Sequence, residues 1–204
     1  VLIDGCGVGE YLSRISSGAE QAVGLDIEFE RALEAAGKGA TAICAAGEAL
    51  PFTNGFFDAL VSHEVIEHVQ DDRQAVLEMT RVLKKGGKVL MFAPNRGYPF
   101  ETHGVMWRGK YRFGNIPLVN YLPRGLRDKL APHVRVYSRR DLADLFTGLP
   151  MNVAYKTVLF GAYDNLIQRF GEAGKILRFT LQSLEKTPLK ILGLSHFWVI
   201  EKTE

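Results

Sequence analysis

Cysteine is scarce in this chain, and long apolar runs are missing from it. Only 2 of the 204 residues are cysteines, Cys6 and Cys44, and both fall in or near expected buried strands. A disulfide-stabilised scaffold is therefore excluded, and a reduced, cytoplasmic protein is favoured. No run of 18 apolar residues occurs, so we expect no transmembrane helix.

An excess of charge of one sign is also lacking. The formal net charge is +2, from 25 Lys and Arg against 23 Asp and Glu, so we expect no nucleic-acid partner. With 47% hydrophobic and 24% charged residues, the composition excludes disordered and collagen-like chains and fits one sizeable α/β domain. Because the chain opens on a buried-type strand, we expect no signal peptide, and we expect further residues upstream of Val1.

The first nine residues, Val1-Leu2-Ile3-Asp4-Gly5-Cys6-Gly7-Val8-Gly9, organise the rest of the chain. They predict a buried strand, a glycine-rich turn and a helix from about Glu10, which together form a nucleotide-type pocket with backbone amides facing the ligand. The alternative is a tight turn without a ligand. The Asp4 carboxylate would repel a pyrophosphate, so a ligand with an ammonium or sulfonium group is favoured.

A second acidic residue closes the next apolar run, Ala22 to Asp26. Asp26 follows Asp4 by 22 residues, close to the spacing of about 20 at which an acid reaches a ribose hydroxyl in βαβ nucleotide folds. The alternative is that Asp26 caps a helix over residues 27–36. A ribose ligand is favoured, because the two roles are compatible.

Strand and helix patterns alternate along the remaining chain, which predicts a parallel, doubly wound α/β sheet. Gly86-Gly87 should stop the third helix. The expected strands are 41–45, 57–62, 88–93, 152–160 and 195–202, and the expected helices are 71–84, 138–147 and 162–185.

Five landmarks in this order resemble class I S-adenosylmethionine-dependent methyltransferases, most closely the small-molecule methyltransferases of the ubiquinone-biosynthesis type. The resemblance covers residues 1 to about 95. The landmarks are Asp4 to Gly9, Asp26, Glu48-Ala49-Leu50-Pro51-Phe52, Glu64-Val65-Ile66-Glu67-His68-Val69 with the strand around Asp58 before it, and Leu83-Lys84-Lys85-Gly86-Gly87.

The resemblance implies a single Rossmann-like domain over residues 1–204, with a mixed sheet of seven strands of which the last is antiparallel. It implies methyl transfer to a small-molecule, lipid-linked or glycan-linked acceptor. Oxygen is favoured over nitrogen, because Ser62-His63-Glu64-Val65 replaces the Asn-Pro-Pro-Tyr type motif of nitrogen-methylating relatives, and over carbon by family analogy. The alternatives are a nucleotide-sugar or nicotinamide enzyme on the same sheet, which Asp4 disfavours, and a non-catalytic binding module.

The resemblance also implies which residues bind S-adenosylmethionine. The glycine turn would pass under its methionine part, Asp26 would hold the ribose hydroxyls, and Ile27 would pack beside the adenine. Gly47 and Glu48 would contact the adenine edge, although Ala46 stands where the family often has an Asp. The full predicted set is Asp4, Gly5, Cys6, Gly7, Gly9, Asp26, Ile27, Gly47, Glu48 and His63.

Glu64, Glu67 and His68 could share one face of a helical turn and bind a divalent metal, as relatives of the ubiquinone type do. The alternative is that Glu67 and His68 are polar groups that orient the loop and the mouth of the substrate site. A hydroxyl acceptor can use a general base, for which His68 and His103 are the candidates. Positioning alone can also suffice for methyl transfer.

Two segments fall outside the family pattern. Residues 96–137 are too long for an ordinary loop and interleave aromatic with basic residues, so we expect a substrate lid suited to an anionic or lipid-linked acceptor or to a membrane surface at the inner face. The alternative is a lid with a small aromatic core. Residues 161–190 predict a helical insertion that could pair with the lid, contact a membrane or form a homodimer.

Overall fold

The computed structural model describes residues 1–161 and 163–204, without the side chains of residues 165 and 166. The chain divides into two compact units. We call residues 1–92, 141–156 and 198–204 the sheet unit, and residues 93–140 and 157–197 the insert unit. The two predicted insertions therefore belong largely to one compact unit rather than to two separate excursions.

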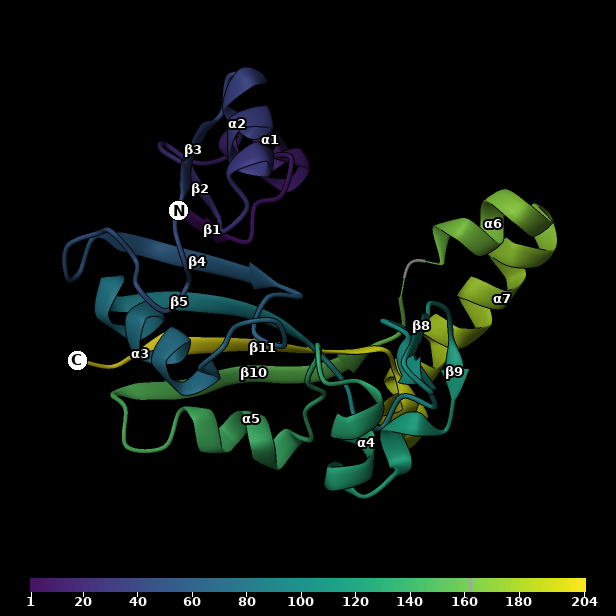
Figure 1. Cartoon of the computed structure of the whole chain (residues 1–204). Helices are drawn as coiled ribbons and strands as arrows, with labels where there is room; N and C mark the ends of the chain where they lie inside the picture. The colour runs from purple at the N-terminus through teal and green to yellow at the C-terminus, as the bar shows by residue number, and fades with distance from the viewer. Residues whose placement is uncertain (162) are drawn as a thin grey trace. The chain divides into compact units, whose positions relative to one another are not determined.

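A sheet of seven strands forms the centre of the sheet unit, in the order β10-β11-β5-β4-β1-β2-β3 (Figure 1). The five strands from β3 to β5 are parallel, whereas the last strands are antiparallel, with β11 between β5 and β10. The predicted Rossmann-like mixed sheet is confirmed. The strands are β1 (Leu2–Asp4), β2 (Val23–Asp26), β3 (Thr41–Cys44), β4 (Phe57–His63), β5 (Leu83–Pro94), β10 (Met151–Leu159) and β11 (Ser195–Lys202).

Strand β1 is completely buried, as its run of apolar residues predicts. Its residue Asp4 pairs with Leu25 of β2 on one side and with Ser62 of β4 on the other. Cys6 belongs to the core beside this strand, together with Ile3, Leu12 and Ala35. The sequence of the first strand therefore places its closing acid inside the sheet, between β2 and β4.

Four helices belong wholly or largely to the sheet unit: α1 (Glu10–Ser16), α2 (Phe29–Gly37), α3 (Asp72–Val82) and α5 (Arg139–Leu145). Gly9 precedes α1 in a left-handed conformation. Asp71 caps α3, because its side chain accepts a hydrogen bond of 2.9 Å from the backbone N–H of Gln74. The predicted helix starts therefore agree with the structure within a few residues.

The predicted end of the third helix is wrong. α3 stops at Val82 rather than at Lys84, because Leu83 is extended, fully buried and paired with Phe57 as the first residue of β5. Gly86 and Gly87 do not stop a helix. They lie inside β5, at an irregularity where the pairing with β4 shifts register. Burial of Leu83 outweighs the helical preference of the lysines that follow it.

The insert unit is tied together by Asn95. Its amide nitrogen donates to the carbonyl oxygens of Ile191 and Gly193, at 2.8 and 2.7 Å. The segment after it contains two short antiparallel pairs, β6 (Phe100–Glu101) with β9 (Ile116–Pro117) and β7 (Val105–Trp107) with β8 (Lys110–Arg112). These pairs are followed by the 3-10 helix η1 (Val119–Tyr121) and by α4 (Arg124–Leu130).

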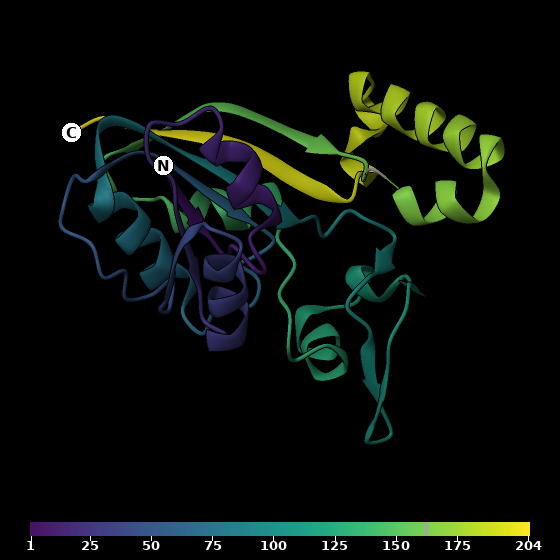
Figure 2. The same cartoon turned by 90° about the horizontal axis from the view of Figure 1, so that it is seen from above.

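The second segment of the insert unit is helical, as predicted, but in several pieces. Figure 2 shows α6 (Asp164–Phe170) and α7 (Glu172–Ser183) as two helices joined by a sharp bend. Gly171 makes the bend with φ 55° and ψ −124°. The 3-10 helices η2 (Leu184–Lys186) and η3 (Pro188–Leu192) then lead to β11. No helix in the described part of the chain is long and apolar enough to cross a membrane.

Candidate cofactor site

The glycine turn after β1 is held in a left-handed conformation. Gly5 and Gly7 have φ values of 68° and 52°, which residues with a Cβ rarely adopt. A Cβ on Gly5 would lie 2.3 Å from Cγ2 of Val65, whereas a Cβ on Gly7 would meet nothing within 4 Å. Packing against Val65 therefore requires a glycine at position 5. Beside the Cα of Gly7, in contrast, there is open space.

That space is a cavity of about 770 Å³ at the carboxyl edge of the parallel strands. Asp4, Asp26 and His63, the last residues of β1, β2 and β4, line it. This is the edge at which ligands bind in open α/β sheets. The other predicted site residues that line the cavity are Gly5, Gly7, Ile27, Gly47, Glu48, Glu64 and His68.

Two residues predicted to bind the cofactor do not line this cavity. Cys6 is buried in the core beside α1, and its thiol is 3.6 Å from the carbonyl oxygen of Gly7. Gly9 begins α1, where a Cβ would come within 3.0 Å of the Ala35 Cβ. Both shape the turn through packing.

The carboxyl group of Asp4, in the cavity wall, has a strongly raised pKa. Its side chain is 2% exposed, and Ser62 donates a hydrogen bond of 3.2 Å to its Oδ2. Burial raises the pKa of Asp4 to about 6, the Ser62 hydrogen bond lowers it in part, and the Glu48 and Asp26 carboxylates raise it further. A cationic ligand in this cavity would favour the ionised carboxylate.

Asp26 is held in place by two backbone groups. Its Oδ2 accepts a hydrogen bond of 2.8 Å from the N–H of Gly7, and its Oδ1 accepts one of 2.9 Å from the N–H of Glu28. Asp26 is not the N-cap residue of α2: Glu28 holds that position, without a capping hydrogen bond from its side chain. Each carboxylate oxygen has a further lone pair for a ligand hydroxyl.

The loop after β3 approaches Asp4 from another side. A Cβ on Gly47 would lie 3.3 Å from Oδ1 of Asp4, so a larger residue would crowd the acid. Oε1 of Glu48 accepts a hydrogen bond of 2.7 Å from the N–H of Gln70. The Glu48 side chain therefore holds the loop to the residues before α3.

His63 forms an aromatic part of the cavity wall. Its ring lies 5.1 Å from the ring of Tyr11 and 4.7 Å from that of Phe92. It therefore contributes a packed ring surface at the end of β4.

Glu64, Glu67 and His68, the predicted metal ligands, lie in the turn that follows β4. The segment is a turn in which the His68 N–H donates 2.9 Å to the Val65 carbonyl, and Glu64 has φ 54°. Nε2 of His68 lies 3.9 Å from Oε1 of Glu67. Within the described residues, the ligand atoms of these three side chains do not all lie within 4.8 Å of one another.

Glu67 is instead a buried carboxyl group with 1% exposure. Burial raises its pKa well above the usual range, and the neighbouring Glu64 carboxylate raises it further. Without a cation nearby, this environment favours the protonated form of Glu67.

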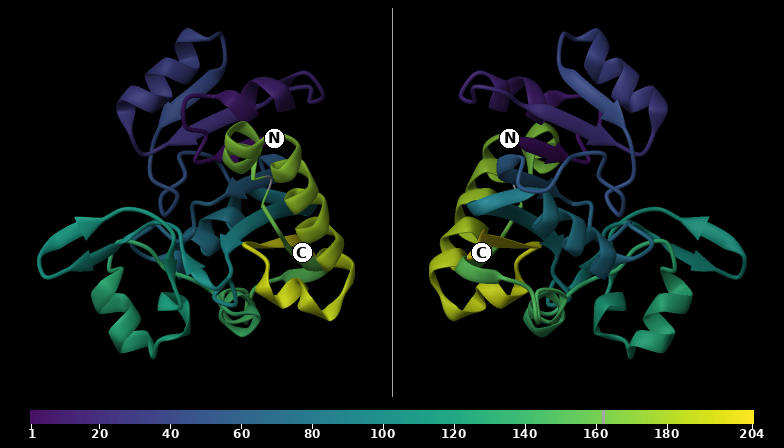
Figure 3. Two further views of the ribbon diagram at one scale, coloured as in Figure 1. Left: turned by 90° about the vertical axis from the view of Figure 1, so that its right-hand side faces the viewer. Right: turned by 90° about the vertical axis from the view of Figure 1, so that its left-hand side faces the viewer.

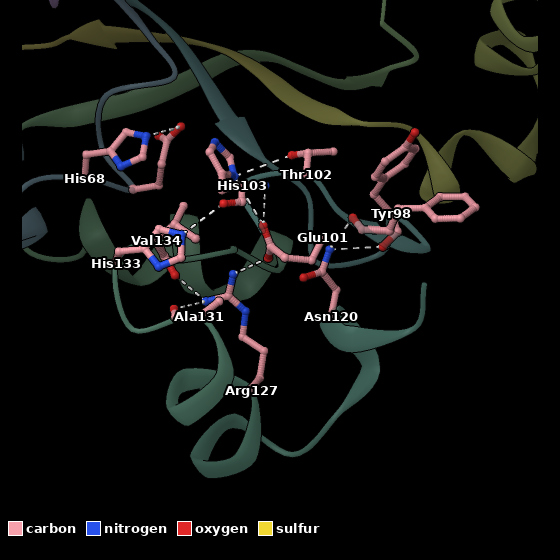
Figure 4. Close-up of polar contacts among 12 residues, drawn as sticks. His68, Tyr98, Glu101, Thr102, His103, Asn120, Arg127, Ala131, His133 and Val134 are labelled. Carbon is pink, nitrogen blue, oxygen red and sulfur yellow. Dashed lines mark hydrogen bonds and ion pairs between the residues drawn. The ribbon is translucent and has the colours of Figure 1, made fainter. Parts of the chain in front are cut away.

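His103 belongs to the insert unit, where it contacts Glu101, one member of a buried ion pair (Figure 4). Glu101 accepts a hydrogen bond of 2.6 Å from Nη2 of Arg127 and one of 2.9 Å from the N–H of His103. Nδ1 of His103 lies 3.3 Å from Oε1 of Glu101. Burial raises the pKa of Glu101, but its contacts with His103 and Arg127 hold it below its usual range overall.

Several cavity residues were missed by the sequence analysis. Leu25 and Glu28 flank Asp26 and could have been found from that position. Val65, Val69, Gln70 and Asp71 reach the cavity because the chain turns back after β4. Val65 and Val69 lie within the Glu64 to Val69 landmark but were not predicted to line the site. Arg31, Ala45 and Ala46 complete the lining.

A parallel sheet with a glycine turn and two buried acids at its carboxyl edge defines a class of proteins, the Rossmann-like folds that bind a nucleotide-type cofactor. Within this class, residues 3–91 match the family model described as "Methyltransferase domain". The solved structure of an S-adenosylmethionine-dependent methyltransferase from Mesorhizobium loti matches 98% of this chain and 89% of its own, with a TM-score of 0.66 and 17% identity, so it shares the fold.

Three curated relatives carry methyltransferase names. A probable S-adenosylmethionine-dependent methyltransferase of Mycolicibacterium smegmatis is 34% identical over 98 residues, 47% of this chain and 38% of that protein. The malonyl-[acyl-carrier protein] O-methyltransferase of Erwinia pyrifoliae is 28% identical over 158 residues, 73% of this chain and 60% of that protein. The ubiquinone/menaquinone biosynthesis C-methyltransferase of Bordetella parapertussis is 33% identical over 95 residues, 43% and 36% respectively.

Residues 3–91 of this chain are therefore similar to the methyltransferase domain, and the curated relatives above carry methyltransferase names. The chain spans less than two thirds of the length of each of these three relatives. The similarity to methyltransferases implies S-adenosylmethionine as the cofactor, and the cavity fits it: the space beside the Gly7 Cα is open, and two acids are available for a cation and for hydroxyl groups.

Proposed function

We propose that this protein transfers a methyl group from S-adenosylmethionine to an oxygen of a small-molecule, lipid-linked or glycan-linked acceptor. The observation that carries the proposal is the buried Asp4 carboxylate in the wall of the cavity. Burial disfavours its ionised form, and a ligand with ammonium and sulfonium groups offsets that cost. A pyrophosphate cofactor would increase it, which argues against a nicotinamide or nucleotide-sugar enzyme.

The other cavity residues have distinct proposed roles. Asp26, fixed by the N–H groups of Gly7 and Glu28, accepts hydrogen bonds from the ribose hydroxyls. Ile27 is largely exposed in the cavity lining and offers an apolar surface to the adenine. The backbone of Gly47 leaves room beside Asp4 for the methionine part of the cofactor.

When bound, S-adenosylmethionine would supply an activated methyl group on a sulfonium. Transfer of that group to an acceptor oxygen would also release the acceptor proton, which a base of the protein would take up. His68 lines the cavity and is the proposed base. No metal takes part in this proposal.

A carbon acceptor is the second candidate. The relative from Erwinia pyrifoliae, which matches 73% of this chain, is named as an O-methyltransferase, and this supports oxygen. The relative from Bordetella parapertussis is named as a C-methyltransferase, and its match covers only 43% of this chain. Product analysis by NMR after incubation with phenols, carboxylic acids and lipid-linked glycans distinguishes the two, because O-methyl and C-methyl carbons differ widely in chemical shift.

The first test is a calorimetric titration with S-adenosylhomocysteine. We expect micromolar binding by the parent and at least tenfold weaker binding by Asp26→Ala, with Asp58→Ala as a matched control because Asp58 is an exposed acid outside the cavity. A folded parent that does not bind would contradict the proposal. Binding without turnover on any acceptor would instead favour a non-catalytic module.

A further inference from the structure

The net charge of the chain hides a strong division between its two units. The insert unit contains 15 Lys and Arg against 5 Asp and Glu, whereas the sheet unit contains 10 against 18. The formal charges are therefore +10 and −8. Charge separated in this way attracts an anionic partner to one unit only.

Exposed apolar side chains follow the same division. Of the 21 large hydrophobic side chains exposed in the described chain, 14 belong to the insert unit, although it has fewer than half of the residues. Ile176 and Phe179, one turn apart on α7, are 68% and 74% exposed. The basic unit therefore also carries most of the exposed apolar surface.

Both properties are concentrated at the hairpin formed by β7 and β8. Residues 107–113, Trp-Arg-Gly-Lys-Tyr-Arg-Phe, are all exposed, and Phe113 reaches 80%. They comprise three aromatic residues, three cations and one glycine. No Asp or Glu occurs between Glu101 and Asp128 to neutralise these cations.

The register of the hairpin sorts its side chains onto two faces. Trp107 pairs with Lys110, and Val105 pairs with Arg112, so Trp107, Lys110 and Arg112 share one face. Tyr111 lies on the other face, where its hydroxyl donates to the carbonyl of His103 and its ring packs edge-on against His133. The inner face is thus anchored, and the outer face presents an indole beside two cations.

The base of the hairpin is rigidly supported. Glu101 and Arg127, both buried, form an ion pair of 2.6 Å, and Glu101 also binds the N–H of His103 just before β7 (Figure 4). Within the insert unit, β7 lies beside α4, and the turn of the hairpin is the outermost part of this segment (Figure 3). The exposed tip is therefore a defined structure on a fixed base.

We propose that the β7–β8 hairpin of the insert unit docks on the surface of an anionic lipid bilayer. Indole rings sit at the level of lipid headgroups, and lysine and arginine bind lipid phosphates while their stems lie against apolar surface. The pattern of Trp107 and Phe113 among Arg108, Lys110 and Arg112 supplies both interactions at one tip. This proposal does not depend on the methyl acceptor, but it would bring the enzyme to lipid-linked molecules.

Single-stranded nucleic acid is the main competing partner for a basic and aromatic surface. The exposed aliphatic side chains favour lipid, because Leu118, Leu126, Ile176 and Ile191 add nothing to base stacking but gain free energy in the acyl boundary. The aromatic residues of the hairpin also lie at a narrow tip rather than along a groove that tracks a backbone.

The test is flotation of the whole chain with vesicles of pure phosphatidylcholine and with vesicles of equal parts phosphatidylcholine and phosphatidylglycerol. We expect binding only to the anionic vesicles, with loss in high salt. Replacing the three hairpin cations should weaken it about a hundredfold, since each contributes roughly fivefold at an anionic leaflet. The hairpin variant is Arg108→Gln with Lys110→Gln and Arg112→Gln.

A matched control removes three exposed cations from the sheet unit: Arg14→Gln with Lys85→Gln and Lys88→Gln. The net charge changes equally, so equal losses by the two triple variants would overturn the assignment to the hairpin. Trp107→Ala should weaken binding at least tenfold without a change in net charge. Absence of binding to anionic vesicles, or binding to single-stranded RNA that the hairpin variant abolishes while vesicles are ignored, would also overturn the proposal. Affinity for S-adenosylhomocysteine, measured on the same samples, reports the cofactor site separately.

Discussion

The hydroxyl of Ser62 donates a hydrogen bond of 3.2 Å to Asp4, and the two residues are direct register partners on the adjacent parallel strands β4 and β1. Both side chains are buried, and the donor is neutral. A single neutral hydrogen bond offsets only part of the cost of burying a carboxylate, so the pKa of Asp4 is raised to about 6. The central acid of the site therefore titrates close to neutral pH.

Replacement of Asp4 should raise the folding stability but weaken cofactor binding. Asp4→Asn is expected to raise the free energy of unfolding at pH 7.5 by about 1–3 kcal/mol, because one pKa unit corresponds to about 1.4 kcal/mol and the ionised form is disfavoured by burial. The same variant should lose at least tenfold in affinity for S-adenosylmethionine. Urea unfolding and calorimetry measure the two effects. Asp58→Asn, at an exposed position, is the control, and parallel losses of stability and binding in Asp4→Asn would contradict the prediction.

Binding of S-adenosylmethionine should depend on pH through the same group. Below about pH 6 Asp4 is protonated and neutral, so it no longer attracts a cation. Affinity should be constant above this pH and fall by up to about tenfold per pH unit below it. Adenosine, which has no cationic group, should show no such fall near pH 6. Equal pH profiles for the two ligands would argue against Asp4 as the partner of the cation.

The folding stability should show the complementary trend. Protonated Asp4 stabilises the folded state fully below about pH 3.8, and this contribution is lost as the pH rises through about 6. The difference between parent and Asp4→Asn in unfolding free energy should therefore grow from pH 5 to pH 8. A constant difference would exclude Asp4 as its source.

Gly5 should tolerate no side chain. Gly5→Ala places a Cβ 2.3 Å from Val65 at a residue with φ 68°, so we expect a loss of about 2 kcal/mol or more in unfolding free energy. Gly37→Ala is the matched control, since it lies at the end of α2 where an added Cβ meets nothing within 4 Å. Thermal and urea unfolding report both. Similar behaviour of the two variants would show that the turn adapts to a Cβ.

The ion pair between Glu101 and Arg127 should stabilise the surrounding part of the insert unit. Arg127→Ala leaves Glu101 buried without its cation, a change that typically costs about 3–5 kcal/mol. We expect faster amide exchange over residues 100–135, with the affinity of the sheet unit for S-adenosylhomocysteine retained. Lys129→Ala, an exposed cation on the same helix, should leave exchange unchanged. Unaltered protection in Arg127→Ala would mean that other contacts hold this segment.

Sequence patterns predicted the structure well where one short segment combined several features. Val1 to Gly9 combined a buried strand, a left-handed turn and a closing acid, so the strand, the turn and the position of Asp4 in the cavity wall could all be predicted. Local signals failed at Leu83, where pairing with Phe57 extends the strand against the helical preference of Lys84 and Lys85. Burial in a sheet is a tertiary property, and it overrides such weak preferences.

The sequence by itself determined the class of fold, the similarity to methyltransferases and the central acids of the site, because hydrophobic periodicity and glycine positions are local features of the chain. Only the tertiary structure decided which residues from separate loops meet at the cavity. It brought the backbone of Gly47 against Asp4 and joined Glu48 to Gln70. It also revealed that the modest net charge divides into a basic unit and an acidic one, since residues distant in sequence share a unit only after folding.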